Sequence, residues 1–297
     1  MEPRSYGPFP YRPIVERRPI RWPNGARVAL WVIPNIEFMP LDEPVQASRA
    51  PVPDVKGFSD FDYGNRVAVF RLMEALDRFG IRATVALNSD ICDRHPEIVA
   101  AGVERRWEFM GHCQSNARWL GRAGSEDAAR AVVAETLARI EKAAGIRPRG
   151  WLGSGLEETW NTLDHLVDEG AAYVADWVND DEPYRMDLGN GRSIVSIPYS
   201  TEINDRPAYV RNRHAPEEFG AMIRAAFDVY HREGARSGRV MAIALHPNLS
   251  GVPHRLDALS DALDYICGHD DVWLATGSEI VDCYLAQAGG ESLQRST

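Results

Sequence analysis

The feature that most constrains this chain is a regular alternation of short apolar segments and longer amphipathic segments between residues 27 and 287. The first apolar segment, Val28–Ile33, is rich in β-branched and aromatic residues. This composition favours a strand buried on both faces, although a buried helical segment would show the same pattern. Further strands are predicted at Ala83–Leu87, Glu108–Met110, Gly150–Leu152, Ala172–Ala175, Ile194–Tyr199, Val240–Leu245 and Val272–Leu274.

The segments between these strands have apolar residues at helical spacing, and several have helix-capping residues at their ends. Helices are predicted at Val67–Phe79, Pro96–Glu104, Ser125–Ala144, Thr159–Glu169, Pro216–Glu233, Arg255–Cys267 and Ser278–Gln287. Strands that alternate with helices in this way are expected to be parallel and joined by right-handed crossovers. About seven or eight strands fit a barrel better than an open sheet. The predicted fold class is therefore α/β.

We expect a single barrel domain over residues 27–287, an N-terminal arm over 1–26 and a polar, disordered tail over 288–297. The arm is rich in proline and aromatic residues, so it is expected to be extended and to build no core of its own. It is either a loose tail or an arm packed on its own domain or on a neighbouring subunit. Residues 38–65 are predicted to form a long irregular loop, and such loops are usually functional.

Composition excludes several classes of partner. The 297-residue chain is 44% hydrophobic and 26% charged, as in soluble globular proteins. Its net charge of −10 and its lack of a basic run argue against nucleic acid and anionic membranes as partners. The four cysteines are widely spaced, which favours reduced thiols over a zinc knuckle. No apolar run reaches the roughly 18 residues of a membrane span, and the start lacks a signal-peptide pattern. We expect a cytoplasmic protein.

Polar residues of the kinds used in catalysis follow five of the predicted strands. They are Asn35 and Glu37, then His112 to Asn116, then Glu157, then Asp176 and Trp177, and last His246. A single histidine after a strand is more often a structural hydrogen-bonding group than a catalytic one. Several such residues are more informative, because the carboxyl ends of the strands of a parallel barrel meet at one mouth.

The order of these segments resembles the polysaccharide deacetylase superfamily, whose members have a distorted (β/α)7 barrel. The family places a catalytic Asp and a metal-binding Asp after the first strand, two metal-binding histidines in a second motif, and a catalytic histidine in a late Leu-His motif. The matching segments here are Asn35-Ile36-Glu37-Phe38, His112-Cys-Gln-Ser-Asn116 and Leu245-His246. The resemblance covers residues 27 to about 285.

Other segments resemble the branch of this family that holds the cofactor-independent allantoinase of urate catabolism. They are Asp62-Tyr-Gly-Asn-Arg66, Gly150-Trp151, Asp180-Asp-Glu-Pro-Tyr184, Ile197-Pro-Tyr-Ser200, Asn204-Asp205 and Gly251-Val-Pro-His-Arg255. That branch has paired acidic residues after the first strand and an arginine after the Gly-Trp strand. This chain has Glu37 then Phe38 at the first place, and Gly153-Ser-Gly-Leu-Glu157 at the second. We therefore expect a substrate other than allantoin.

The departures from the family pattern bear on the metal. Phe38 cannot bind a metal ion, Asn116 is a weak donor, and His112 alone does not provide the three protein ligands of a catalytic zinc site. We expect no catalytic metal and no other cofactor; the competing interpretation is an unusual Glu37–His112–Asn116 metal site. Zinc lowers the pKa of bound water from 15.7 to about 7, whereas a carboxylate base supplies only about 10²–10⁴-fold. A metal-free enzyme should therefore favour a reactive carbonyl, such as that of a cyclic ureide or imide.

The roles that follow are hypotheses. Glu37 acts as general base and is expected to have a raised pKa. His112 and His246 polarise the carbonyl or protonate the leaving nitrogen. Asp176 is expected to orient a histidine, and Trp151 and Trp177 to form flat pocket walls, although both could equally be core residues. The predicted substrate-binding residues are Asn35, Asn116, Trp151, Glu157, Asp176, Trp177, Asn204 and Asp205.

The sequence thus predicts a hydrolase that cleaves a carbon–nitrogen bond in a small, cyclic substrate without a metal. One alternative is a metal-dependent N-deacetylase of an acetylated amino sugar. Another is a catalytically inactive binding protein on the same barrel. We expect a small-molecule substrate, no nucleic-acid or membrane partner, and a homo-oligomer, because the aromatic residues of the arm need cover.

Overall fold

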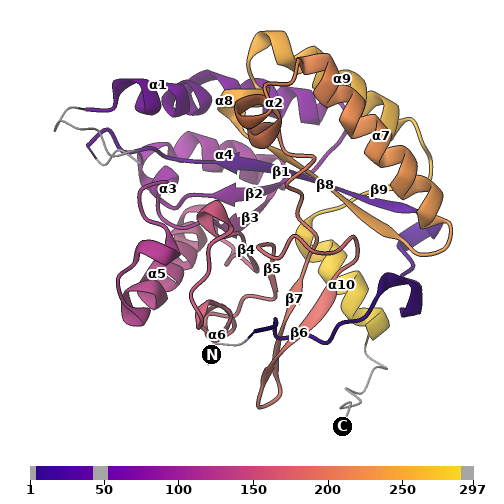
Figure 1. Ribbon diagram of the computed structural model, residues 1–297. Coiled ribbons are helices and arrows are strands. Elements are labelled where there is room, and N and C mark those ends of the chain that lie inside the picture. The colour runs from indigo at the N-terminus through magenta and orange to yellow at the C-terminus, as the bar shows by residue number, and fades with distance from the viewer. Residues whose placement is uncertain (1–4, 43–52, 289–297) are drawn as a thin grey trace.

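Strand β1 (Val28–Ile36) has neighbouring strands on both sides in a curled sheet of the computed structural model, which describes residues 5–42 and 53–288 (Figure 1). All nine of its residues are buried, as expected for an apolar strand covered on both faces. β1 pairs in parallel with β8 (Arg239–Leu245) along most of its length. Its first half also pairs with β9 (Val272–Leu274), and its last residues pair with β2 (Thr84–Leu87).

The rest of the sheet continues outward from β2. It adds β3 (Glu108–Gly111), β4 (Gly150–Trp151), β5 (Tyr173–Val174), β7 (Arg192–Ser196) and β6 (Tyr184–Gly189), in the order β6-β7-β5-β4-β3-β2-β1-β8. Every described pairing is parallel except the β6–β7 hairpin. An isolated parallel bridge joins Asn204 to Ala244 of β8. The sheet is therefore a curled half-barrel, which confirms the predicted α/β class.

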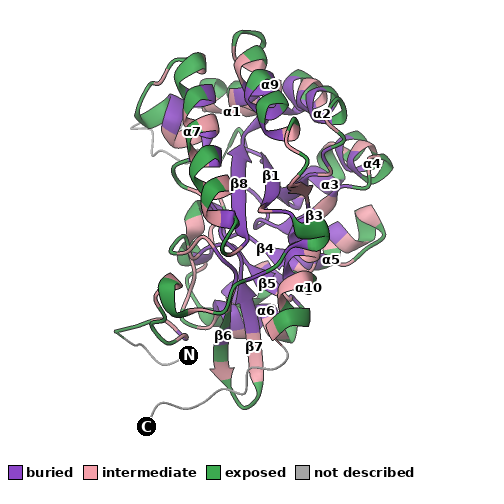
Figure 2. Cartoon of the chain, turned by 90° about the vertical axis from the view of Figure 1, so that its right-hand side faces the viewer, coloured by how far each residue is buried: buried purple, intermediate pink, exposed green. Residues whose placement is uncertain are grey.

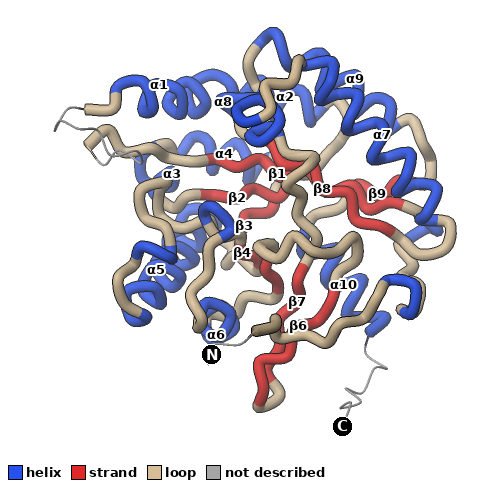
Figure 3. Tube along the Cα trace, in the orientation of Figure 1, coloured by secondary structure: helices blue, strands red, loops and turns tan. Residues whose placement is uncertain are grey.

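Helices cover the outer face of the sheet (Figures 1 and 3). The α-helices are α1 (Val55–Tyr63), α2 (Val69–Asp77), α3 (Asp90–Arg94), α4 (Pro96–Glu104), α5 (Glu126–Ala144), α6 (Thr162–Asp168), α7 (Pro216–Gly234), α8 (Pro247–Ser250), α9 (Pro253–Cys267) and α10 (Gly277–Ala288). Buried residues line the side that faces the sheet, and exposed residues face outward (Figure 2). In α5 the Ser125 side chain accepts a hydrogen bond from the Ala128 amide, and Gly145 ends the helix with φ +76°.

The prediction that residues 38–65 form an irregular loop is wrong for its second half. Residues 43–52 lie outside the described part of the chain, but α1 begins at Val55. The Asp54 carboxylate accepts a hydrogen bond from the Gly57 amide and caps this helix, and Lys56 pairs with Asp60 one turn later at 2.5 Å. A π-helical turn (Gly64–Ala68) then joins α1 to α2.

Strand β6 was also missed by the sequence reading. Every second residue is exposed and Met186 alone is buried, so the strand lacks the continuous apolar run that marks the central strands. The turn at Gly189-Asn190-Gly191, where all three residues have positive φ, joins it to β7. The two strands form an antiparallel hairpin at the edge of the sheet, which projects at the bottom of Figure 1.

The N-terminal segment packs on the chain's own barrel. The Trp22 indole N–H donates to the Arg239 carbonyl at 3.0 Å, and its side chain is buried. Arg17 forms an ion pair with Asp180 at 2.6 Å, and the Phe9 ring contacts the Trp177 ring edge-on. Of the polar tail predicted from residue 288, only Ala288, the end of α10, is described. No helix in the described ranges has the length and apolar character to cross a membrane.

Candidate functional site

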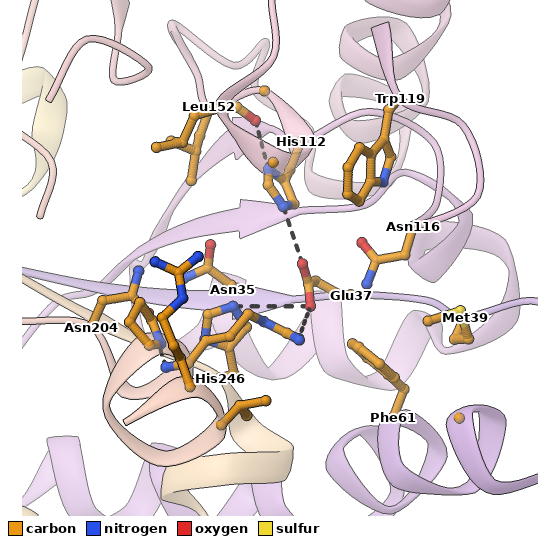
Figure 4. Close-up of a pocket in the computed structure, with 18 of the residues that line it drawn as sticks. Asn35, Glu37, Met39, Phe61, His112, Asn116, Trp119, Leu152, Asn204 and His246 are labelled. Atoms are coloured by element: carbon orange, nitrogen blue, oxygen red, sulfur yellow. Dashed lines mark hydrogen bonds and ion pairs between the residues drawn. The ribbon is translucent and has the colours of Figure 1, made fainter. Parts of the chain in front are cut away.

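A cavity of about 760 Å³ opens at the carboxyl ends of the central strands (Figure 4). Six of the predicted site residues line it: Asn35, Glu37, His112, Asn116, Asn204 and His246. The apolar part of the wall includes Met39, Phe61, Trp119, Leu152 and Tyr199. Segments from both halves of the chain therefore meet around one space.

Glu37 lies at the centre of this group, immediately after β1. Its carbonyl accepts a hydrogen bond from the Asn65 side chain at 2.9 Å, which fixes the backbone at the end of the strand. The carboxylate is only 9% exposed. One of its oxygens is 3.3 Å from His112 Nε2, and the other is 3.1 Å from Arg206 Nη2 and 4.0 Å from His246 Nε2. The carboxylate thus faces three nitrogen-bearing side chains (Figure 4).

The electrostatic surroundings of Glu37 correct one expectation. Burial acts to raise the pKa of Glu37, but the positive charge of Arg206, the hydrogen bond from His112 and the charge of His246 together hold that pKa well below its usual range. The predicted raised pKa is therefore wrong for the free protein. Glu37 is an ionised carboxylate at neutral pH, and the Arg206 guanidinium weakens it as a base.

His112 is held by the strand next to its own. It follows β3, and its Nδ1 lies 2.6 Å from the Leu152 carbonyl oxygen at the end of β4. Nε2 faces Glu37, so both ring nitrogens face oxygen acceptors. The Leu152 carbonyl and the Glu37 carboxylate can only accept, so a hydrogen on either ring nitrogen has an acceptor within reach. His112 can therefore present an N–H donor to a developing negative charge beside Glu37.

His246 is oriented from behind by Asp205. Asp205 is fully buried, and one of its oxygens accepts from His246 Nδ1 at 2.6 Å. The other oxygen accepts from the His246 amide and from the Ser250 hydroxyl, both at 2.7 Å. This network turns His246 Nε2 toward Glu37 and the cavity. Asp205 was predicted to bind substrate, but its oxygens are occupied by these groups and it acts on the site through His246.

Asp176 does not orient a histidine, contrary to the prediction. One of its oxygens accepts from the Gly153 amide at 2.6 Å. Its neighbour is a second carboxyl group, Glu158, which accepts from the Trp177 indole at 3.0 Å. Burial and the Glu158 charge raise the pKa of Asp176 well above its usual value, and burial raises the pKa of Glu158 to about 7. This carboxyl pair lies outside the cavity lining.

Three other predicted residues do not line the cavity either. Trp151 is fully buried and packs into the core beside Gly111. Trp177 packs against Phe9 of the N-terminal segment, and the Glu157 carboxylate lies beside Gly121. The aromatic wall expected from Trp151 and Trp177 is supplied by Trp119 and Phe61 (Figure 4).

The polar amides differ in how free they are to meet a ligand. The Asn35 amide group lies within 3.3 Å of the Ile33 and Leu245 carbonyls, so it ties β1 to β8. The Asn204 oxygen accepts from the Arg206 amide at 3.0 Å. Asn116 is fixed through its backbone, which donates to the Phe38 carbonyl at 3.0 Å, and its side chain points toward Glu37 in Figure 4. Asn116 is thus the amide best placed to contact a ligand.

Sequence reasoning missed Arg206, Phe61 and Trp119. Arg206 carried a signal, because it directly follows the Asn204-Asp205 pair and because a buried carboxylate needs a cationic partner. Phe61 lies in the segment that was predicted to be irregular, and no sequence pattern marked Trp119. Arg206 also supplies a guanidinium to a site from which the resemblance indicated that an arginine had been lost.

The metal ion expected from the family does not fit these residues. In the described ranges, no three His, Cys, Asp or Glu side chains are grouped so that they could hold a metal ion. Phe38, at the position of a family ligand, is buried, with the Arg94 guanidinium 4.5 Å from its ring centre. The Glu37–His112–Asn116 alternative meets a further obstacle, since the Arg206 guanidinium already lies 3.1 Å from Glu37 and would repel a metal cation.

Comparisons with known proteins find polysaccharide deacetylases and an allantoinase among the similar proteins. No model of a protein family matches the chain. A Schizosaccharomyces pombe protein named "Putative polysaccharide deacetylase" is 24% identical over 299 residues, 90% of this chain and 92% of that protein. A probable polysaccharide deacetylase from Pseudomonas aeruginosa PAO1 superposes with a TM-score of 0.84 at 27% identity, covering 93% of this chain and 97% of that one. The Puue allantoinase superposes with a TM-score of 0.81, also at 27% identity, over 91% and 94% of the two chains.

Proposed function

Because the chain belongs to the polysaccharide deacetylase superfamily, a family of hydrolases, we propose that it hydrolyses a carbon–nitrogen bond in a small cyclic ureide or imide, with Glu37 as general base and without a metal ion. The similarity to an allantoinase supports an amide-type bond in a ring. The cavity of about 760 Å³ suits a small molecule.

The observation that carries the proposal is the group of nitrogen-bearing side chains around Glu37. A buried carboxylate that faces His112, His246 and Arg206 can accept a proton from water while the neighbouring nitrogens stabilise negative charge. The oxygen of the water bonds to the carbonyl carbon, the ring C–N bond breaks, and the leaving nitrogen takes up a proton. His246, held by Asp205, and His112 are the groups that can supply that proton.

The same arrangement indicates which carbonyl groups would react. A carboxylate base contributes only about 10²–10⁴-fold, far less than a metal-bound hydroxide can supply. The carbonyl must therefore be more reactive than that of a plain acetamide. A flat ureide or imide ring meets this condition, and it could lie against the aromatic faces of Trp119 and Phe61.

The test is a hydrolysis panel. Purified protein is incubated with cyclic ureides, cyclic imides, formamides and N-acetylated amino-sugar oligomers, and ring opening or acetate release is followed. We expect turnover of one or more cyclic substrates and none of the sugars. Glu37→Gln should abolish it, while Glu202→Gln, a change of an exposed glutamate on a nearby loop, should leave it unchanged.

Two results would count against the proposal. Turnover of acetylated sugars alone would favour the N-deacetylase. Tight binding of a ring without any turnover, equal in wild type and Glu37→Gln, would favour a binding protein on this barrel.

A further inference from the structure

Arg206 differs from the other residues around Glu37 in the exposure of its side chain. Its backbone is fixed, because its amide donates to the Asn204 side chain at 3.0 Å just before the π-helical segment Pro207–Arg211. Its side chain, however, is 41% exposed, whereas that of Glu37 is 9% exposed. The guanidinium carbon lies 5.4 Å from the centre of the Phe61 ring. The guanidinium can therefore shift along the aromatic face without disturbing the backbone that carries it.

The hydrogen bonds of Arg206 leave capacity for a ligand. A guanidinium has five N–H donors in a planar fork that matches a carboxylate. Among the described contacts, its side chain donates to Glu37 through Nη2. Arg206 lines the cavity, so its remaining donors lie where a bound molecule could reach them.

The pairing of Arg206 with Glu37 lowers the basicity of Glu37, and an anionic substrate could reverse this effect. A carboxylate that holds a guanidinium is a poor base, because protonating it breaks the ion pair. An anionic group on the substrate would compete with Glu37 for the same guanidinium. Binding of such a substrate would leave Glu37 with His112 and His246 and make it more basic when water must be deprotonated.

We propose that Arg206 is the specificity-determining residue of this site and that its ligand is an anionic oxygen of the substrate, most simply a carboxylate carried by a cyclic ureide ring, which it binds in exchange for Glu37. This proposal rests on the proposed function for the role of Glu37. Its binding step can be measured without turnover, so the two can fail separately.

The experiment uses two matched pairs of rings: dihydroorotate with dihydrouracil, and hydantoin-5-acetate with 5-methylhydantoin. Each pair shares a ureide ring and differs in the carboxylate. Binding is measured by titration calorimetry and turnover by ring opening. For wild type we expect tighter binding and higher kcat/KM for the carboxylated member of at least one pair. Arg206→Gln should lose about 10- to 100-fold in affinity for that member only, the effect of one charged hydrogen bond, and Arg206→Lys should restore part of it.

A second variant tests the exchange itself. Glu37→Gln removes the group that competes for Arg206, so it should bind the carboxylated ring about 10-fold more tightly than wild type while losing turnover. A purely structural role of Arg206 would give no such gain. Arg236→Gln, at an exposed position away from the cavity lining, is the control and should change neither quantity.

The outcomes separate the two proposals. The role of Arg206 is overturned if the neutral rings are hydrolysed and neither pair shows a preference for the carboxylated member. It is also overturned if such a preference survives in Arg206→Gln. Both results leave the proposed function standing. Binding of the carboxylated ring that depends on Arg206 and tightens in Glu37→Gln, but without any hydrolysis, supports the anion site and overturns the proposed hydrolase. Absence of both binding and turnover of the carboxylated rings overturns the anion site.

Discussion

Glu37 and Asp176 are both buried carboxyl groups that follow central strands of the same half-barrel, yet their surroundings are opposite. Glu37 faces Arg206, His112 and His246, and these groups lower its pKa despite burial. Asp176 faces Glu158, and burial together with this like charge raises its pKa. A position at the end of a strand is thus not enough to identify a catalytic carboxylate. The charges that surround it decide between an ionised carboxylate and a group held in its neutral form.

The two regions also differ in their histidines. His112 and His246 both reach the Glu37 side, and each is held on its far nitrogen by an oxygen acceptor. Near Asp176 the described contacts are a backbone amide and the second carboxyl group. The Glu37 region therefore brings a carboxylate and two imidazoles together, as the proposed proton transfer requires, whereas Asp176 holds the amide of Gly153.

The largest expected difference between the two regions is in activity. Glu37→Gln should lower kcat on a cyclic substrate by about 10²–10⁴-fold, because the amide cannot accept a proton from water. Asp176→Asn should keep near-wild-type kcat, because the asparagine oxygen can still accept from the Gly153 amide. Steady-state kinetics on both variants measures this. Comparable losses of kcat in the two variants would show that the two carboxyl groups do not differ in their contribution to activity.

The next effect concerns the histidine behind Glu37. Asp205→Asn replaces a carboxylate that accepts three hydrogen bonds and holds His246 Nδ1. We expect kcat to fall about 10²-fold, because the misoriented imidazole loses its part in proton transfer. Circular dichroism should show a folded protein, and KM should change little. A variant with unchanged kcat would mean that His246 takes no part in the chemistry.

The sequence could predict those site residues that directly follow a strand, but not those that reach the site from elsewhere in the chain. Glu37, His112 and His246 were predictable because each directly follows an apolar strand, and strand ends in a parallel barrel converge. The partner of His246 was not, since Asp176 directly follows a predicted strand whereas Asp205, which holds His246 in the structure, does not. Arg206 reaches Glu37 across 169 positions of sequence, a contact that periodicity does not encode.

Some elements of the fold could likewise be predicted from the sequence and others could not. The apolar strands and long amphipathic helices were predictable because burial leaves a periodic pattern. Helix α1 was not, since none of its residues is fully buried and it therefore lacks the apolar pattern of a core helix; Phe58 packs on the core only in part, and Asp54 caps the first turn. Strand β6 was missed because its residues alternate in burial at the sheet edge. That Trp151 and Trp177 lie outside the cavity wall follows from tertiary packing alone.

A pH measurement sharpens the account of the Glu37 region. The groups facing Glu37 are His112, His246 and Arg206, with Asp205 behind His246 and Tyr199 nearby. Glu37 works as a base only when ionised, so kcat/KM should fall as the pH falls through its lowered pKa. Arg206→Gln removes a positive charge and should move this acidic limb upward by roughly one pH unit. An unmoved limb would show that Arg206 does not set the basicity of Glu37.

The smallest effect is on stability in the Asp176 region. A carboxyl group whose pKa is raised in the folded state binds its proton more tightly there, so stability falls as the pH rises from its usual pKa to the raised one. For Glu158 this window runs from 4.5 to about 7. Burial and the Glu158 charge also raise the pKa of Asp176 well above its usual value, so Asp176→Asn removes a carboxyl group that is costly to ionise. It should raise the free energy of unfolding by about 1–2 kcal/mol at neutral pH and above, with no gain at acidic pH. Urea unfolding across the window measures this, and an equal gain at all pH values would point to packing.

The central claim is that Glu37 activates water without a metal ion, and it is tested most directly by measuring turnover and metal content on the same sample. The protein is dialysed against a chelator, its zinc, cobalt, iron and manganese are quantified, and its rate on the best cyclic substrate is compared before and after metal is added back. We expect the full rate at negligible metal content and no gain on adding metal. A rate that is lost with the metal and returns in proportion to one bound ion per chain would contradict the account.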